Sequence, residues 1–258
     1  MVVSFLGAAA GNANISVGNI IGSNIMNTML ILGLTSLLLP ITITDSNKKK
    51  DIPINLIFTC ILVALGIISA GLGRIDGAIL LTLFAAYMYW SFKNGKEEFA
   101  IEEEEEKQNL PYSIFLIVAS VAALFFGGRM FVNSAISLAN AIGVSDKFIA
   151  ITLLAGGTSM PELATCVAAA VKKKGQLALG NIIGSNIFNM FLILGGASLI
   201  NPLNFKDITY VDISMLVVSA ACLAIWPYIG KKNTIGKFEG IVMLILFATY
   251  ITYISFNF

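Results

Sequence analysis

Long apolar stretches, separated by short polar segments, make up most of the chain. A helix needs about 20 such residues to cross the ~30 Å hydrocarbon layer of a membrane, because it rises ~1.5 Å per residue. Shorter segments of alternating hydrophobicity, typical of membrane β-barrels, are absent, so the pattern predicts an all-α integral membrane protein. We expect a partial helix at residues 2–10 and eight spans, at residues 15–39, 53–72, 75–94, 112–139, 148–171, 177–200, 208–229 and 238–255.

Composition and charge narrow the class further. Hydrophobic residues make up 57% of the 258 residues and charged residues 12%, outside the range of soluble globular domains. The net charge of +1 gives no reason to expect a nucleic-acid partner. There is no histidine, and Cys60, Cys166 and Cys222 lie inside apolar stretches, so neither disulfides nor a zinc or copper site are expected. The expected surroundings are a lipid bilayer, and the oligomeric state stays open.

One polar motif occurs twice. Residues 18–33 (GNIIGSNIMNTMLILG) and 180–195 (GNIIGSNIFNMFLILG) are identical at 13 of 16 positions, at an offset of 162. The second copy lies five predicted spans after the first, and an odd number of crossings reverses the direction of the chain. The copies therefore predict inverted repeats, which are typical of secondary transporters that bind their substrate near the middle of the membrane.

The positive charges support this topology, because short cytoplasmic loops are enriched in Lys and Arg. On one side of the membrane, the loops between predicted spans carry only Arg74, Lys147 and Lys206. The other side, which we interpret as cytoplasmic, carries Lys48, Lys49, Lys50, Lys93, Lys96, Lys107, Lys172, Lys173, Lys174, Lys231, Lys232 and Lys237.

The spans and charges together predict the organisation of the chain. Residues 1–95 form a first inverted repeat, residues 96–110 an acidic cytoplasmic linker, and residues 111–258 a second inverted repeat. The C-terminus is expected outside, and the location is the cell membrane, crossed several times. The run of glutamates in the linker is interpreted as a solvated segment.

The repeated motif places oxygen-bearing side chains on one helical face. Ser23 and Asn27 are four residues apart, as are Ser185 and Asn189, so each pair shares a face of its helix. A structural interpretation is also open, in which these residues join closely packed helices through the small-residue spacing of Gly18, Gly22, Gly180 and Gly184.

A carboxylate within a predicted span favours the functional interpretation. Glu162 lies in AGGTSMPEL, residues 155–163, and an ionisable residue deep in a membrane usually marks function. Pro161 should break the helix and expose backbone carbonyls near Ala155. Thr158, Ser159 and Glu162 then add hydroxyl and carboxylate oxygens. Such oxygens, without imidazole or thiolate, suit a hard cation such as Ca²⁺ or Na⁺.

The segment GTSMPEL, followed by GNIIGSNIFN, resembles the second repeat of the cation/calcium exchanger superfamily, and most closely its prokaryotic sodium/calcium antiporter branch. The resemblance implies a ten-helix fold of two inverted five-helix halves that exchanges Na⁺ for Ca²⁺ by alternating access. It implies no enzymatic activity and no cofactor besides the transported ions. The implied cation ligands are Glu162, in a bidentate role, with Thr158, Ser159, the Ala155 carbonyl, Ser23, Asn27, Ser185 and Asn189.

The chain departs from that family pattern at two places. Some relatives carry an acid at the position of Asn189 or Asn27, so the expected site has less negative charge and potassium dependence is disfavoured. The offset of 162 also puts the counterpart of Glu162 just before Met1, so the first repeat is expected to lack its GTSxPE motif, its first helix and half of its second. An internal start or a truncated gene would explain this, and a transport-inactive fragment is one expected outcome.

Two further alternatives stay open at this point. A proton/calcium exchanger would use the same carboxylate but cycle it through protonation. A channel-like or purely structural membrane protein would use the polar stripes for helix packing. An intramembrane hydrolase is disfavoured, because the Ser and Thr residues have no His or Lys beside them to act as a base.

Overall fold

A computed structural model describes residues 13–94, 155–206, 208–229 and 233–257, together with part of 111–137. Within these residues six helices are long and apolar enough to cross a membrane, which matches six of the eight predicted spans. A seventh, shorter apolar helix covers the second half of the span predicted at 148–171. The predictions for residues 2–10 and the linker at 96–110 lie outside the described residues, and that for 112–139 is described only in part. The six spans are Ser16–Leu38, Asn47–Ile68, Arg74–Lys93, Gly175–Ile200, Tyr210–Tyr228 and Lys237–Phe256.

Several spans combine regular helix with short π-helical or 3₁₀ segments, labelled η. The elements before the linker are α2 (Ala13–Ile25), η1 (Met26–Leu32), α3 (Gly33–Leu38), β1 (Ile41–Thr42), η2 (Asn47–Asp51), α4 (Ile52–Ile68), β2 (Gly71–Leu72) and α5 (Arg74–Asn94). Those after it are α8 (Ala155–Thr158), α9 (Met160–Val171), α10 (Gly175–Ile187), η5 (Phe188–Ile193), α11 (Leu194–Ile200), β3 (Leu203–Asn204), α12 (Tyr210–Ile225), η6 (Trp226–Tyr228), β4 (Thr234–Ile235) and α13 (Lys237–Asn257).

Features recur in the two halves at nearly the same offset as the sequence motif. The π-helical segments η1 and η5 begin at Met26 and Phe188, 162 residues apart. Strand β1 pairs antiparallel with β4, and β2 pairs with β3, so each half supplies a strand to the other. Ile41 opposes Ile235 in one pair and Leu203 opposes Leu72 in the other. The two halves are therefore interlocked rather than separate.

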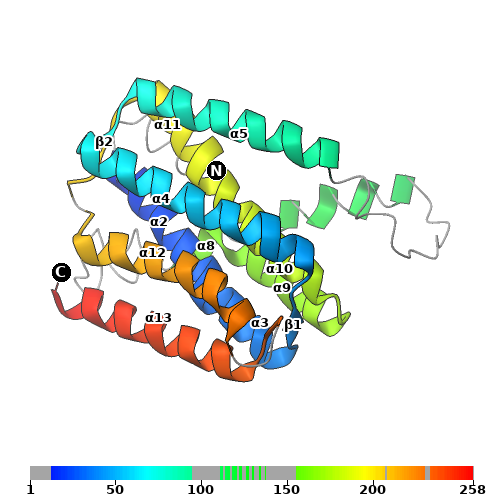
Figure 1. Cartoon of the computed structure of the whole chain (residues 1–258). Coiled ribbons are helices and arrows are strands. Elements are labelled where there is room, and N and C mark those ends of the chain that lie inside the picture. The colour runs from blue at the N-terminus through cyan, green and yellow to red at the C-terminus, as the bar shows by residue number, and fades with distance from the viewer. Residues whose placement is uncertain are drawn as a thin grey trace.

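Two helix crossings recur in the same way. Helix α5 packs against α11, and α13 packs against α3 (Figure 1). A Cβ atom added at Gly77 of α5 would lie 2.7 Å from the carbonyl oxygen of Gly195, and one at Gly240 of α13 would lie 2.8 Å from that of Gly33. Glycine at these two positions lets the backbones approach more closely than any side chain would allow.

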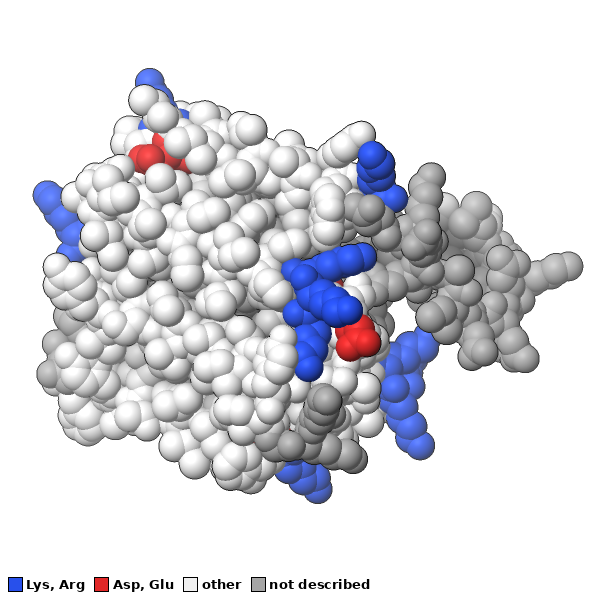
Figure 2. All heavy atoms as spheres, viewed as in Figure 1, with Lys and Arg blue, Asp and Glu red and all other residues white. Residues whose placement is uncertain are grey.

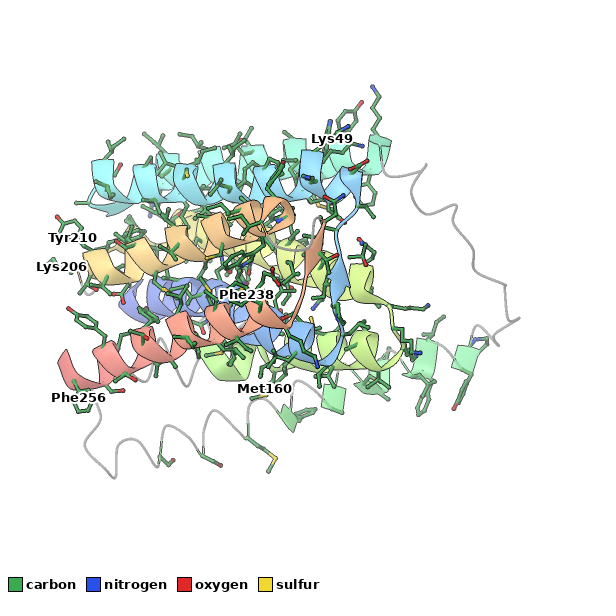
Figure 3. All side chains as sticks on the ribbon, turned by 60° about the horizontal axis from the view of Figure 1, so that its bottom comes forward. Lys49, Met160, Lys206, Tyr210, Phe238 and Phe256 are labelled. Carbon is green, nitrogen blue, oxygen red and sulfur yellow. The ribbon has the colours of Figure 1, made fainter. Side chains whose placement is uncertain are left out.

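The repeated motif forms the centre of the bundle. Helix α2 and segment η1 are almost entirely buried, and the outer helices turn large apolar side chains outward, as a lipid-facing surface requires. Most visible Lys and Arg side chains gather at one end of the molecule (Figure 2). Lys49 lies at that end and Lys206 at the other (Figure 3). This charge asymmetry agrees with the topology predicted from the loops.

Candidate functional site

The helix break predicted at Pro161 is present. Helix α8 ends at Thr158 and α9 begins at Met160, with Pro161 in the first turn of α9. Ser159 lies between them with φ −93° and ψ 1°, outside the regular helical region. Proline fits this first turn because the missing N–H would have no helical partner there. The break puts Glu162 in the first turn of a short membrane helix.

Thr158 joins α8 to the first copy of the motif. Its Oγ1 lies 2.9 Å from the Ser23 Oγ and 3.1 Å from the Asn19 Oδ1. It also lies 3.1 Å from the Ala155 carbonyl oxygen, which accepts a hydrogen bond from the Ser159 N–H as well. The Thr158 hydroxyl has one hydrogen, so it donates either to the Asn19 Oδ1 or to the Ala155 carbonyl, which already accepts the Ser159 N–H. A cation that bound both the Ala155 carbonyl and Thr158 would take the place of any hydrogen bond between them.

Glu162 faces the second copy of the motif. The Ser185 side chain interacts with its carboxylate, while the Asn181 Nδ2 lies 3.5 Å from the Glu162 backbone carbonyl. Helix α9 packs along α10 to bring these groups together. Each copy of the motif thus meets a different polar side chain at the helix break, Thr158 for the first copy and Glu162 for the second.

Three predicted ligands carry a buried oxygen atom without a hydrogen-bond partner. These atoms are the Ser159 Oγ, the Glu162 Oε2 and the Asn27 Oδ1. Among the described residues, two other buried side-chain atoms share this state, the Asn55 Oδ1 and the Trp226 Nε1. Leaving a polar atom buried and unpaired costs about 1–3 kcal/mol, and more for a charged group, so three such oxygens on predicted ligands need a further partner.

The donor set suits a hard cation. The described residues contain no group of three or more His, Cys, Asp and Glu side chains that could hold a metal. The oxygens around the break come instead from hydroxyls, amides, one carboxylate and the backbone. Ca²⁺ and Na⁺ accept such oxygens, whereas zinc and copper favour imidazole and thiolate.

Asn24 and Asn186 also join the two copies of the motif, and the sequence predictions did not name them as site residues. The Asn27 Nδ2 donates to the Asn186 Oδ1 at 3.1 Å, and the Asn189 Nδ2 donates to the Asn24 Oδ1 at 3.0 Å. The available signal was their place in the repeat, since residues 24 and 186 are equivalent at the offset of 162.

The structural interpretation of the motif gains less support. A Cβ atom added at Gly180 or Gly184 would meet no atom of the described residues within 4 Å, so these two glycines mediate no close crossing with a described helix. All eight predicted site residues lie on three packed units: α2 with η1, α8 with α9, and α10 with η5. Ser23 contacts Thr158, and Ser185 contacts Glu162. The side chains of Asn27 and Asn189 donate to Asn186 and Asn24, which are residues of the motif rather than of the helix break.

Comparison with known proteins agrees with this geometry. A family model described as sodium/calcium exchanger protein matches residues 1–93 and 112–256. An uncharacterized membrane protein of Methanocaldococcus jannaschii is 39% identical over 235 residues, covering 90% of this chain and 74% of that protein. The sodium/calcium exchanger MaX1 of Methanosarcina acetivorans is 29% identical over 281 residues, covering 93% and 79%.

A solved structure extends the similarity to the whole described fold. The sodium-calcium exchanger NCX_Mj superposes with a TM-score of 0.81 at 35% sequence identity, over 97% of this chain and 80% of that one. The fold of this chain therefore follows that of a solved sodium-calcium exchanger. With most of its length matched by the family model, this chain belongs to the sodium/calcium exchanger protein family.

Proposed function

We propose that this protein exchanges Na⁺ for Ca²⁺ across the cell membrane by alternating access, with the cations bound at the helix break. The observation that carries the proposal is the set of buried, unpaired oxygens on Ser159, Glu162 and Asn27. A bound cation would give each of these oxygens the positively charged partner that it lacks. Family membership and the similarity to NCX_Mj support the same activity.

Glu162 is the proposed charged ligand. Its carboxylate balances part of the charge of Ca²⁺, and neutral oxygens complete a shell of six to eight ligands. Na⁺ accepts the same oxygens at similar distances, so the two ions compete, which is what exchange at one site requires. The proposed neutral ligands are Ser159, Asn27, Thr158, the Ala155 carbonyl, Ser23, Ser185 and Asn189.

The proposed organisation follows the inverted repeats. Residues 1–95 and 111–258 are the two repeats, joined by an acidic cytoplasmic linker at 96–110, and the C-terminus lies outside. The lysine-rich end seen in Figure 2 supports this orientation, because positive residues favour the cytoplasmic side. Movement of one helix group against the rest of the bundle would open the site to each side in turn. The protein is proposed to act without enzymatic catalysis and without any cofactor besides the transported ions.

Ion flux in proteoliposomes tests the proposal. An outward Na⁺ gradient at constant pH should drive Ca²⁺ uptake, and removing the gradient with a Na⁺ ionophore should stop it. Uptake driven by a pH gradient alone, in the absence of Na⁺, would instead favour a proton/calcium exchanger. The absence of coupled uptake under both gradients would refute exchange.

A further inference from the structure

Four asparagines form a hydrogen-bonded arrangement between the two copies of the motif, which we call the amide clasp: Asn24 and Asn27 from the first copy, Asn186 and Asn189 from the second. The Asn27 Nδ2 donates to the Asn186 Oδ1, and the Asn189 Nδ2 donates to the Asn24 Oδ1, at 3.1 and 3.0 Å. A shift of 162 residues exchanges the two bonds. The clasp is thus a reciprocal contact between the two copies.

The chemistry of a side-chain amide gives the clasp a consequence for ion binding. An amide presents an acceptor oxygen on one side and a donor NH₂ group on the other, and rotation about its last torsion exchanges them. A cation binds the oxygen and is repelled by the NH₂ group. In the clasp, the NH₂ groups of Asn27 and Asn189 are held by their partners. The Asn27 Oδ1 is buried and has no hydrogen-bond partner.

The two accepting asparagines are themselves fixed. The Asn24 Nδ2 donates to the Asn186 backbone carbonyl at 3.3 Å, and the Asn186 Nδ2 donates to the Thr28 Oγ1 at 2.9 Å. Both side chains are buried, with 2% and 3% of their surface exposed. Their oxygens are therefore held at defined positions, since the NH₂ group of each amide already donates a hydrogen bond.

We infer that Asn24 and Asn186 are positioning residues, which orient the amides of Asn189 and Asn27 so that an oxygen rather than an NH₂ group faces the transported cation. This inference rests on the proposed function, because it assigns no ligand role to Asn24 or Asn186 themselves. Without its partner, each amide samples both orientations, so the affinity for Na⁺ and Ca²⁺ falls while the maximal rate is largely kept.

Double-mutant cycles of Ca²⁺ uptake test the inference. Asn24→Ala and Asn186→Ala should each raise the apparent KM for Ca²⁺ about tenfold, the size of one hydrogen bond that serves a charged group. Asn24→Ala should add nothing to Asn189→Ala, and Asn186→Ala nothing to Asn27→Ala, because each acts through its partner. The effects of Asn24→Ala and Asn27→Ala, which are not partners, should multiply. Multiplying effects within the partner pairs would overturn the inference.

A second measurement needs no transport and separates failure of the clasp from failure of the proposed function. In nanodiscs containing ¹⁵N-asparagine-labelled protein, Asn186→Ala should shift the side-chain amide signals of Asn27, and Asn24→Ala those of Asn189. Asn55→Ala is the matched control, because Asn55 is an equally buried amide of α4 that takes no part in the clasp. Unchanged signals in both clasp variants would refute the clasp, even in a protein that exchanges ions normally.

Discussion

The two copies of the repeated motif have nearly the same sequence but different neighbours. In the first copy, Ser23 lies against Thr158, and in the second, the equivalent Ser185 lies against Glu162. The first copy is almost fully buried, with 83% of its most apolar window inside the protein, compared with 56% for the second. Equal sequence therefore gives equal helices but unequal environments, and the environment decides what each serine can do.

The contacts that join the halves are symmetric, in contrast to those around the helix break. The strand pairs and the close crossings at Gly77 and Gly240 each occur twice in equivalent positions. We interpret the symmetric contacts as the framework of the bundle. The asymmetric contacts of Thr158 and Glu162 then define the ion site, and substitutions in the two groups should behave differently.

The largest effect is expected at the carboxylate. Glu162→Gln should reduce Na⁺-driven Ca²⁺ uptake by about 100-fold or more, because it removes the proposed negative ligand of a dication in a low-dielectric site. Glu239→Gln is the matched control, since Glu239 is a buried glutamate that, like Glu162, lies in the first turn of a membrane helix, and it accepts the Gly236 N–H. Its side-chain oxygen remains in glutamine, so uptake should be kept. Equal losses in the two variants would contradict a special role for Glu162.

Substitutions in the symmetric framework should lower the stability of the protein, by similar amounts in both halves. An added Cβ at Gly77 collides with Ser198 and Gly195, and one at Gly240 with Ser36 and Gly33. Gly77→Ala and Gly240→Ala should each lower the free energy of unfolding by roughly 2 kcal/mol or more, as overpacking does. Gly180→Ala, which meets no described atom, should be close to neutral. Thermal unfolding in detergent measures the stability of all three variants. A large loss of stability in only one of Gly77→Ala and Gly240→Ala would contradict the equivalence of the two crossings.

The hydroxyl at the helix break should matter more than other buried hydroxyls. Ser159→Ala should raise the apparent KM for Ca²⁺ about tenfold, because its unpaired oxygen is a proposed ligand. Ser219→Ala provides the control, since that buried hydroxyl donates to the Leu216 carbonyl at 2.7 Å. It should change stability by about 1 kcal/mol and leave the KM unaltered. Should both variants show the same KM, Ser159 would not be a ligand.

The smallest effect tests the comparison of the copies most closely. Ser185→Ala should weaken apparent Ca²⁺ affinity severalfold more than Ser23→Ala, because Ser185 touches the carboxylate and Ser23 touches a neutral hydroxyl. Parallel Ca²⁺ titrations of uptake in the two variants measure the ratio. Equal affinities would mean that the two copies contribute equally, despite their different neighbours.

Much of the framework could be predicted from local patterns. The identical residues of the motif located both central helices, and Pro161 located the break before α9, because a proline cannot continue the helical hydrogen bonds. Helix ends were less predictable. The span predicted from residue 53 begins at Asn47, since the polar segment Asn47–Asp51 continues the helix as a π-helical turn beyond its apolar part.

The contacts between helices were beyond the reach of a single sequence. Spacing shows that Ser23 and Asn27 share a face, but not which face of another helix they meet. The clasp through Asn24 and Asn186 depends on how two helices 162 residues apart are rotated against each other. The π-helical segments η1 and η5 alter that rotation within the motif itself, and no residue type marks them reliably.

The account depends most directly on a cation bound beside Glu162. Strontium, which scatters anomalously and takes the same oxygen ligands as calcium, can locate it in crystals of the protein grown without Na⁺. An anomalous peak within bonding distance of the Glu162 carboxylate, the Ser159 hydroxyl and the Asn27 amide oxygen is the predicted result. A peak elsewhere in the bundle, with these three oxygens remote from it, would contradict the proposed site.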